Sequence, residues 1–350
     1  MSDGDGSDGG ESGDGDELTY ADAGVDIDAS EAATAALIGA VGGGVGEEAG
    51  EGSDSDYAGL LDIGDRYLAL ATDGVGTKLL VAEALNDYST VGIDCIAMNV
   101  NDLVAAGVRP VAFVDYLAVD EPDERFARQV GEGLSRGAEL AEMALVGGET
   151  AVMPDVIRGL DLAGACVGLA PKDALFDGRA EPGDALVGWR SSGIHSNGLT
   201  LARKAVTRDH AYTDSCPFDG YETLGAALLE PTAIYAALLD PMREHGVRGA
   251  AHVTGGGWTN LTRLGGHRYA VDDEFDPQPV FEFVQSEGNV TDEEMYRTFN
   301  MGTGFVAALD PEAAEELAAA TDGRVIGRVE AAEGGTSSEG SSVAIRGLEL

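Results

Sequence analysis

The segment Ala71–Lys78 (Ala-Thr-Asp-Gly-Val-Gly-Thr-Lys) brings together an acid, two glycines, a hydroxyl and a cation. It follows the β-prone run Arg66–Leu70, so we expect Asp73 at the end of a strand, with its side chain free to face a ligand. Glycines let the backbone approach a bulky anion, and hydroxyl and ammonium groups add a hydrogen bond and a positive charge. The residues that supply these features are Gly74, Gly76, Thr77 and Lys78.

This combination suits a metal-bound polyphosphate, but its spacing is not the G-x-x-x-x-G-K-[ST] spacing of a Walker loop. The same residues also fit a plain glycine turn with a solvated Asp and a solvated Lys. The segment alone leaves both interpretations open.

A second acidic group follows in Thr90–Gly107, which we predict to be a helix that ends at Gly107. The spacings i, i+4, i+7 and i+8 place four residues on one stripe of this helix: Asp94, Met98, Asn101 and Asp102. A buried carboxylate costs several kcal/mol unless it is paired or binds a metal, so the stripe indicates either a buried pairing or a metal site. Asp94 alone also fits an interaction with the helix dipole, which does not explain Asp102.

Two histidines stand beside small-residue turns that follow predicted strands. His195 and Asn197 lie in Ser191–Gly198, ahead of a predicted helix, and His252 precedes Gly255-Gly256-Gly257. Such turns point backbone N–H groups toward an anion. A lone histidine is more often structural, but two in equivalent settings favour a role in binding or proton transfer.

Two further charged residues lie near glycine turns. Glu149 follows Gly147-Gly148, where we expect the strand Ala144–Val146 to end. Arg297 lies on a predicted helix that runs into a Gly-Thr-Gly turn. Arg297 fits either a fork for a substrate phosphate or a surface salt bridge with nearby acids.

The elements that position these residues alternate between apolar runs and amphipathic stretches, which predicts a mixed α/β (α+β) protein of two domains. Residues 1–17 contain only acids and small or polar residues after Met1, which is typical of a disordered acidic tail. We expect an N-terminal domain over residues 18–170 and a C-terminal α/β domain over residues 171–350. The turn-rich segment Pro171–Gly183 is the expected boundary.

The charge is strongly acidic, with 63 acidic and 21 basic side chains and a formal net charge of −42. Such a chain repels nucleic acids and anionic membranes, so we expect neither as a partner. Acidic excess with few lysines resembles halophilic proteins, because molar salt shortens the Debye length to about 3 Å and screens self-repulsion. The three cysteines form no C-x-x-C pair, and no apolar run reaches the roughly 18 residues that span a bilayer. A cytoplasmic location is expected.

Six segments, in this order, resemble the phosphoribosylformylglycinamidine cyclo-ligase (AIR synthase) family from about Leu18 to the C-terminus. They are Tyr20–Asp26, Thr72–Lys78, Gly147–Thr150, His195–Gly198, His252–Gly257 and Glu294–Asn300. The resemblance implies ATP-dependent ring closure of formylglycinamidine ribonucleotide to aminoimidazole ribonucleotide, with Mg²⁺ and release of ADP and phosphate, in purine biosynthesis. It also implies a homodimer whose N-terminal domains pair their mixed sheets into a central barrel, with a C-terminal α/β domain on each outside.

Residue roles are carried over where the motifs match. Asp73 and Asp102 would hold Mg²⁺, with Asp94 a weaker candidate. His195, His252, Glu149 and Asp73 are the catalytic candidates. The triphosphate would lie against Gly74, Gly76, Thr77 and Lys78, with Asn101 assisting. The substrate would contact Asn197, Gly255, Gly256, Gly257 and Arg297.

One segment departs from the family pattern, since residues 42–56 are acidic and lack lysine where relatives commonly carry a basic, glycine-rich stretch. Other ATP-using members of the superfamily are alternatives: formylglycinamidine ribonucleotide synthetase, selenophosphate synthetase and thiamine-monophosphate kinase. A reactive Cys near the N-terminus would favour the selenophosphate enzyme, but the first cysteine here is Cys95. A non-catalytic nucleotide-binding maturation factor is the alternative from another class.

Overall fold

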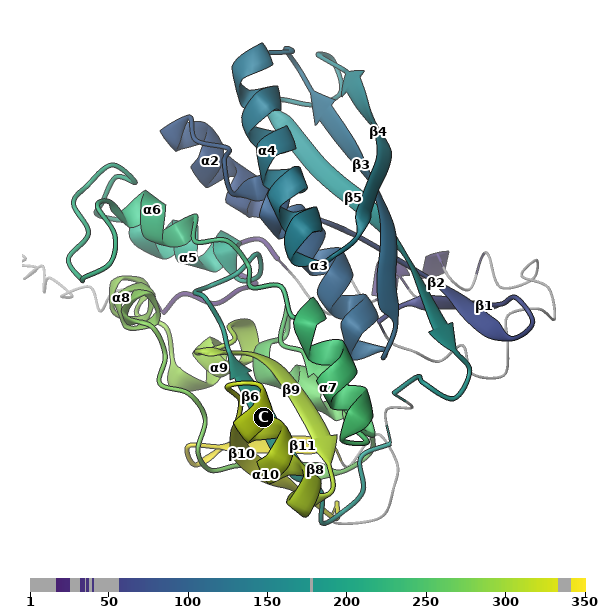
Figure 1. The fold of residues 1–350 in the computed structure, drawn as a ribbon. Coiled ribbons are helices and arrows are strands. Elements are labelled where there is room, and N and C mark those ends of the chain that lie inside the picture. The colour runs from purple at the N-terminus through teal and green to yellow at the C-terminus, as the bar shows by residue number, and fades with distance from the viewer. Residues whose placement is uncertain are drawn as a thin grey trace, which may run out of the picture.

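The structure is a computed structural model that describes residues 17–25, 32–34, 36–37, 40, 57–176, 179–332 and 341–350. Residues 1–16 of the predicted tail and the acidic segment 42–56 lie outside the described residues. Figure 1 shows a sheet with helices on one side, joined to a second sheet that helices also cover. Among the described residues, no helix combines the length and apolarity needed to cross a membrane.

The first sheet has five strands in the order β1-β2-β5-β3-β4. Strands β3 and β4 are parallel and the other neighbours are antiparallel. The strands are β1 (Gly59–Asp62), β2 (Arg66–Gly74), β3 (Arg109–Val119), β4 (Ala144–Val152) and β5 (Leu160–Pro171). The accompanying helices are η1 (Gly76–Lys78), α2 (Leu79–Leu85), α3 (Val91–Ala105) and α4 (Glu124–Leu140).

Helix α3 is the centre of this half, because almost every residue from Val91 to Ala105 is buried and the helix packs on β2, β5, α4 and β7. It ends where Gly107 adopts a φ of +76°, which confirms the predicted helix and its glycine stop. Helix α4 covers the same side of the sheet (Figure 1). The opposite face leaves large apolar side chains exposed, among them Leu70, Val114 and Tyr116.

One predicted boundary is wrong. Strand β4 does not end at Val146 but continues through the glycine pair to Val152. Its pairing with β3 supplies ladder hydrogen bonds across the glycines, with Glu149 opposite Tyr116. Glu149 therefore lies within a strand rather than at the tip of a turn.

The second sheet has seven strands in the order β12-β11-β8-β10-β6-β9-β7, antiparallel except for the β8–β11 pair. The strands are β6 (Ala185–Arg190), β7 (Gly249–His252), β8 (Arg268–Val271), β9 (Thr303–Leu309), β10 (Arg324–Glu330), β11 (Ser342–Ile345) and β12 (Leu348–Glu349). The helices are α5 (Leu199–Val206), α6 (Leu224–Leu228), η2 (Ala236–Leu238), α7 (Leu239–Glu244), η3 (Gly257–Leu264), α8 (Pro279–Gly288), α9 (Asp292–Thr298) and α10 (Pro311–Ala320). All of β9 is buried, so this strand forms the core of the second half.

Candidate active site

Two carboxylates meet where the two halves join. Asp73 comes from the end of β2 and Asp102 from α3. The pKa of Asp73 is raised to about 6. Burial is the largest cause, and the negative charge of Asp102 contributes to the same rise. The N–H of Gly74 donates to Asp73 Oδ1 at 2.7 Å and acts in the opposite direction. A bound cation would favour the ionised form of Asp73 at this site.

Asn99 supports Asp73 and was not among the predicted residues. It is buried on α3, and its side-chain N–H group donates to the backbone carbonyls of Asp73 at 3.2 Å and Cys95 at 2.9 Å. Its Oδ1 is buried without a hydrogen-bond partner. Its signal in the sequence is an amide inside a largely apolar helix, but Asn99 falls outside the stripe that contains Asp94 and Asp102.

His252 lies against Asp102. The fully buried ring places Nδ1 at 3.1 Å from Asp102 Oδ1 and Nε2 at 3.3 Å from Asn101 Nδ2. Nδ1–H donates to the carboxylate, which orients the ring as in carboxylate–histidine pairs of acid–base sites. The structure therefore joins three predicted residues: Asn101, Asp102 and His252.

Asn101 also connects the two halves of the chain. Its Nδ2 donates to the carbonyl of Ala233 at 2.8 Å, and its Oδ1 accepts from the N–H of Tyr235 at 2.9 Å. Both amide atoms are thus engaged within the protein. Its predicted contact with a nucleotide stays a prediction.

His195 occupies the neighbouring loop and is 1% exposed. Its Nε2 accepts hydrogen bonds from the backbone N–H groups of Ser192 at 3.1 Å and Ala233 at 3.4 Å. Burial lowers the pKa of His195 well below its ordinary value, and positive charge on His252 and Lys78 acts in the same direction. The ring of Tyr235 lies close to both histidines, with centroid distances of 6.5 Å to His195 and 6.4 Å to His252.

Asn300, at the end of the Glu294–Asn300 motif, holds the His195 loop. Its buried side-chain N–H group donates to the carbonyls of Gly193 at 2.9 Å and Ile194 at 3.2 Å. The motif carries part of the family resemblance, and Arg297 is its one residue that the sequence predicts for the site. The part of the motif that positions the site is its asparagine.

The glycine turn after β7 lies beside Asn197. A Cβ added at Gly255 would lie 3.4 Å from Asn197 Oδ1, and Asn260 ties the turn by donating to the carbonyls of Gly255 and Gly257. Gly256 adopts a φ of +93°, which favours glycine. The turn and Asn197 thus form one wall near His195.

Other predicted residues are placed elsewhere. Lys78 and Asp94 form a salt bridge in which neither side chain is exposed. Thr77 Oγ1 shares a hydrogen bond of 2.9 Å with Thr200 Oγ1. Arg297 pairs at 3.0 Å with Glu293 on the surface, which is the salt bridge that the sequence left open.

Glu149 is exposed on β4, and among the described residues no hydrogen bond or ion pair joins it to the histidines. Across the same residues, no group of three or more His, Cys, Asp or Glu side chains is placed to hold a metal ion. The three predicted metal ligands therefore do not gather; Asp73 and Asp102 share one site and Asp94 belongs to the salt bridge with Lys78.

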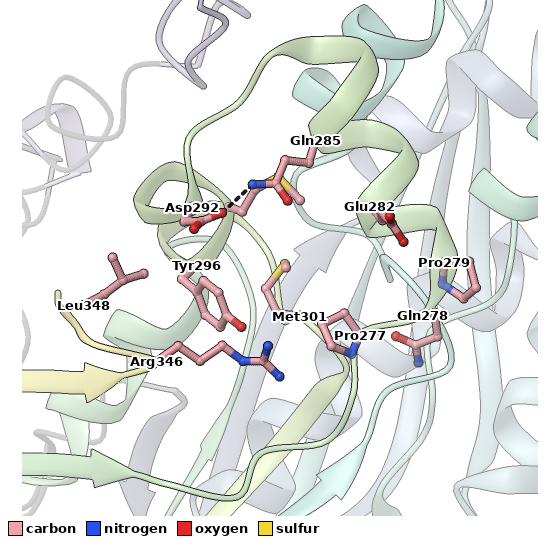
Figure 2. A pocket seen from close by; sticks show the side chains of 11 residues that line it. Pro277, Gln278, Pro279, Glu282, Gln285, Asp292, Tyr296, Met301, Arg346 and Leu348 are labelled. Carbon is pink, nitrogen blue, oxygen red and sulfur yellow. Dashed lines mark hydrogen bonds between the residues drawn. The ribbon is translucent and has the colours of Figure 1, made fainter.

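A pocket of about 310 Å³ lies in the second half, between α8, α9 and the β11–β12 turn (Figure 2). None of the predicted site residues lines it. Arg346, from the turn, lies below Tyr296, while Glu282 and Asp292 lie on the other side of the pocket. Arg346 pairs with the buried Glu274, and Asp292 accepts a hydrogen bond of 2.6 Å from Gln285.

Two mixed sheets with an Asp–His–Asn cluster at their junction define a two-part AIR synthase-type protein. The sequence model of the AIR synthase related protein N-terminal domain matches residues 55–170, and that of the C-terminal domain matches residues 181–338. The chain belongs to this family.

Its relatives carry one specific name. Phosphoribosylformylglycinamidine cyclo-ligase of Methanosarcina acetivorans is 50% identical, with 89% of this chain and 95% of the relative covered. The protein of the same name from Methanocaldococcus jannaschii is 45% identical, with 89% and 92% covered. The family and enzyme class predicted from the six motifs are confirmed.

Solved structures show the same fold at lower identity. A structure titled "AaThiL complexed with AMPPCP and TMP" has a TM-score of 0.64 at 15% identity and covers 93% of this chain and 96% of its own. The structure of tt0281 from Thermus thermophilus has a TM-score of 0.58 at 23% identity, with 90% and 97% covered. These likenesses confirm the predicted α/β (α+β) fold class with mixed sheets.

Proposed function

We propose that this chain closes the imidazole ring of formylglycinamidine ribonucleotide to give aminoimidazole ribonucleotide, with conversion of ATP to ADP and phosphate. The names and coverage of the relatives support this activity. The observation that carries it is the Asp102–His252–Asn101 cluster beside Asp73, at the junction of the two halves. In this reaction ATP phosphorylates the formyl oxygen, the amidine nitrogen attacks the activated carbon, and phosphate leaves as the ring closes.

The carboxylates fit a magnesium ion. Mg²⁺ is commonly bound by one or two protein carboxylates together with substrate phosphates, and Asp73 and Asp102 provide that number. Burial, and then the negative charge of Asp102, raise the pKa of Asp73, and a bound cation would favour its ionised form. When bound, the ion would neutralise phosphoryl charge. Residues of the chain would transfer the proton and hold the substrate.

Proton transfer is assigned to His252, which Asp102 orients through Nδ1. Its Nε2 is the atom that would accept a proton from the attacking nitrogen. The turn Gly255–Gly257 and Asn197 are proposed to hold the substrate phosphate through backbone and amide N–H groups. Gly74, Gly76 and Thr77 remain the proposed triphosphate contacts.

For the remaining catalytic and phosphate candidates, the surroundings weigh against direct contact. Lys78 has no exposed surface and Arg297 is paired on the surface. Glu149 lies on the exposed edge strand, where it could reach a reacting group only in an assembly of chains.

We also propose a homodimer that pairs the first sheets into a barrel. The face of this sheet opposite α3 and α4 leaves Leu70, Val114 and Tyr116 exposed, and strands of a neighbouring chain would bury them. The proposal also includes a domain boundary near residue 171. It further includes a cytoplasmic location and function in concentrated salt. The acidic composition supports the last of these.

The test is an assay of the purified protein in concentrated KCl with Mg²⁺ and ATP, with and without formylglycinamidine ribonucleotide. Equal amounts of ADP and aminoimidazole ribonucleotide, formed only with the substrate, are expected. A folded protein that binds ATP and makes no product at any KCl concentration would sink the proposal. Thiamine monophosphate serves as the competing substrate, because the fold is shared with a protein crystallised with TMP.

A further inference from the structure

The two hydrogen bonds at His195 Nε2 fix the state of its ring. Both donors are backbone N–H groups, from Ser192 at 3.1 Å and Ala233 at 3.4 Å. A backbone N–H cannot accept, so Nε2 must present a lone pair to both. A neutral imidazole carries one N–H, and the proton of His195 therefore lies on Nδ1.

The donors themselves are held firmly. Ser192 Oγ donates to the carbonyl of Pro231 at 2.6 Å, which fastens the His195 loop to the segment before Ala233. Thr232 donates through its N–H and its hydroxyl to Asp94 Oδ1, at 2.8 and 2.6 Å. The ring therefore receives its hydrogen bonds from a scaffold anchored on α3.

The opposite ring nitrogen is unusual. Nδ1 of His195 is buried and has no hydrogen-bond partner, although an unmet buried donor costs about 1–3 kcal/mol. His195 also adopts a φ of +67°, which costs a non-glycine residue of order 1–3 kcal/mol. A Cβ added at Gly304 would lie 2.7 Å from His195 Cε1, so the ring has little room to turn away. Strain and an unmet donor at one residue indicate that the fold holds this N–H for a ligand.

We propose that His195 is a catalytic residue that stays neutral and donates its Nδ1–H to an anionic oxygen of the bound phosphoryl or formyl group. This inference rests on the proposed function. Negative charge develops on these oxygens during phosphoryl transfer and departure of phosphate, and a fixed N–H stabilises it without losing its proton. Because Nδ1 is covered in this structure, substrate binding must open a path to it.

The groups that face His195 keep it neutral. Positive charge on His252 and on Lys78, which is paired with Asp94, opposes protonation of His195. The Tyr235 ring packs near the imidazole as well. Burial lowers the pKa of His195 in the same sense. His195 therefore differs from His252, whose Nδ1 lies against a carboxylate.

Nuclear magnetic resonance tests the tautomer directly, since the full chain has five histidines. With ¹⁵N-labelled histidine, His195 is identified as the ring whose signals disappear from spectra of His195→Asn, and we expect that ring to remain the Nδ1–H tautomer from pH 6 to pH 9. Adding AMPPCP, Mg²⁺ and formylglycinamidine ribonucleotide should shift its Nδ1 resonance. An Nε2–H tautomer, a ring that titrates in this range, or an Nδ1 resonance unmoved by these ligands would overturn the inference.

Two substitutions separate the ring nitrogens. The side-chain amide of His195→Asn lies near the former Nδ1, and asparagine tolerates a positive φ; the longer His195→Gln places its amide near the former Nε2. We expect kcat of His195→Gln to fall by about a hundredfold or more, as for loss of an oxyanion donor, and kcat of His195→Asn to stay at least tenfold higher. The acid limb of the kcat/KM profile should keep its midpoint in His195→Asn.

Equal loss of kcat in both variants, with unchanged thermal unfolding and substrate binding, would contradict the role of Nδ1. So would loss of the acid limb in His195→Asn, because that result would make His195 the base. If the wild-type chain makes no product, the proposed function fails separately, and the tautomer and its ligand-induced shift still decide the inference.

Discussion

Lys78 and Asp94, both in the first half of the chain, form a buried salt bridge with Nζ 2.8 Å from Oδ1 and no exposed surface on either side chain. The lysine also donates to the carbonyl of Glu230, and Asp94 accepts from Thr232. A pair derived from the opening motif and α3 thus holds the segment that supplies Ala233 to His195. Its evident role is to position the site.

Substituting Lys78→Met should destabilise the protein by about 3–5 kcal/mol, because Asp94 would remain buried without its partner. The double variant Lys78→Met, Asp94→Leu should recover part of this loss. Unfolding by guanidinium chloride in concentrated KCl measures the free energy. The control is Glu293→Gln, which removes the partially exposed pair with Arg297 and should change stability by less than about 1 kcal/mol. If Lys78→Met and the control lower the free energy of unfolding equally, the buried pair stabilises the protein no more than the surface pair does.

The exposed apolar face of the first sheet predicts the oligomeric state. Val114→Asp places a charge in the middle of this face and should convert a dimer to a monomer, because a second chain could bury that carboxylate only at high cost. Light scattering after size-exclusion chromatography gives the mass. Leu140→Asp, at the exposed end of α4, is the matched control and should leave the dimer intact. A wild-type chain that is monomeric in low and high salt would remove the barrel proposal.

The net charge of −42 predicts a strong dependence of stability on salt. Raising KCl from about 0.1 M to above 1 M shortens the Debye length from about 10 Å to 3 Å or less and should increase Tm, because repulsion among the carboxylates is screened. A Tm series at constant pH tests this, with tetramethylammonium chloride as a control for ionic strength alone. A Tm that does not change across the series would refute salt adaptation.

Much of the fold could be read from local patterns. The helix α3 was predicted from Thr90–Gly107 and its glycine stop, and strand β2 from the β-prone run Arg66–Leu70. The end of β4 could not be predicted from the sequence, because pairing with β3 keeps a glycine pair extended that locally resembles a turn. Register between distant strands is a tertiary property.

The site was partly predictable from local sequence patterns. The stripe on α3 indicated buried polar groups that need partners; Asp94 and Asn101 are fully buried, and the structure brings Asn101, Asp102 and His252 together. The partner of each side chain could not be inferred, because contacts such as Lys78 with Asp94 depend on how η1 docks against α3. The carbonyl and N–H groups of residues 231–235 carry no signal in the side-chain pattern.

Asp73 allows a prediction that combines pH and metal. Its folded-state pKa of about 6 lies above the ordinary value of 3.8, so the fold favours the protonated acid. The resulting stabilisation is present below about pH 4 and is lost as the pH rises through about 6. Asp73→Asn should therefore gain stability relative to the wild type over this interval, when both are measured without metal.

Magnesium should reverse this order, because it requires the ionised carboxylate. At pH 7.5, Mg²⁺ with AMPPCP should raise the Tm of the wild type, and at pH 5 the increase should be smaller, since protons compete for Asp73. Asp73→Asn should show little increase at either pH and little metal-dependent turnover. Asp115→Asn is the control, because burial also raises the pKa of Asp115 but its side chain lies on β3 against Gly148 of β4. If Asp73→Asn retains full turnover and the full Mg²⁺-induced increase in Tm, Asp73 is not a ligand, and the raised pKa reflects burial beside Asp102 alone.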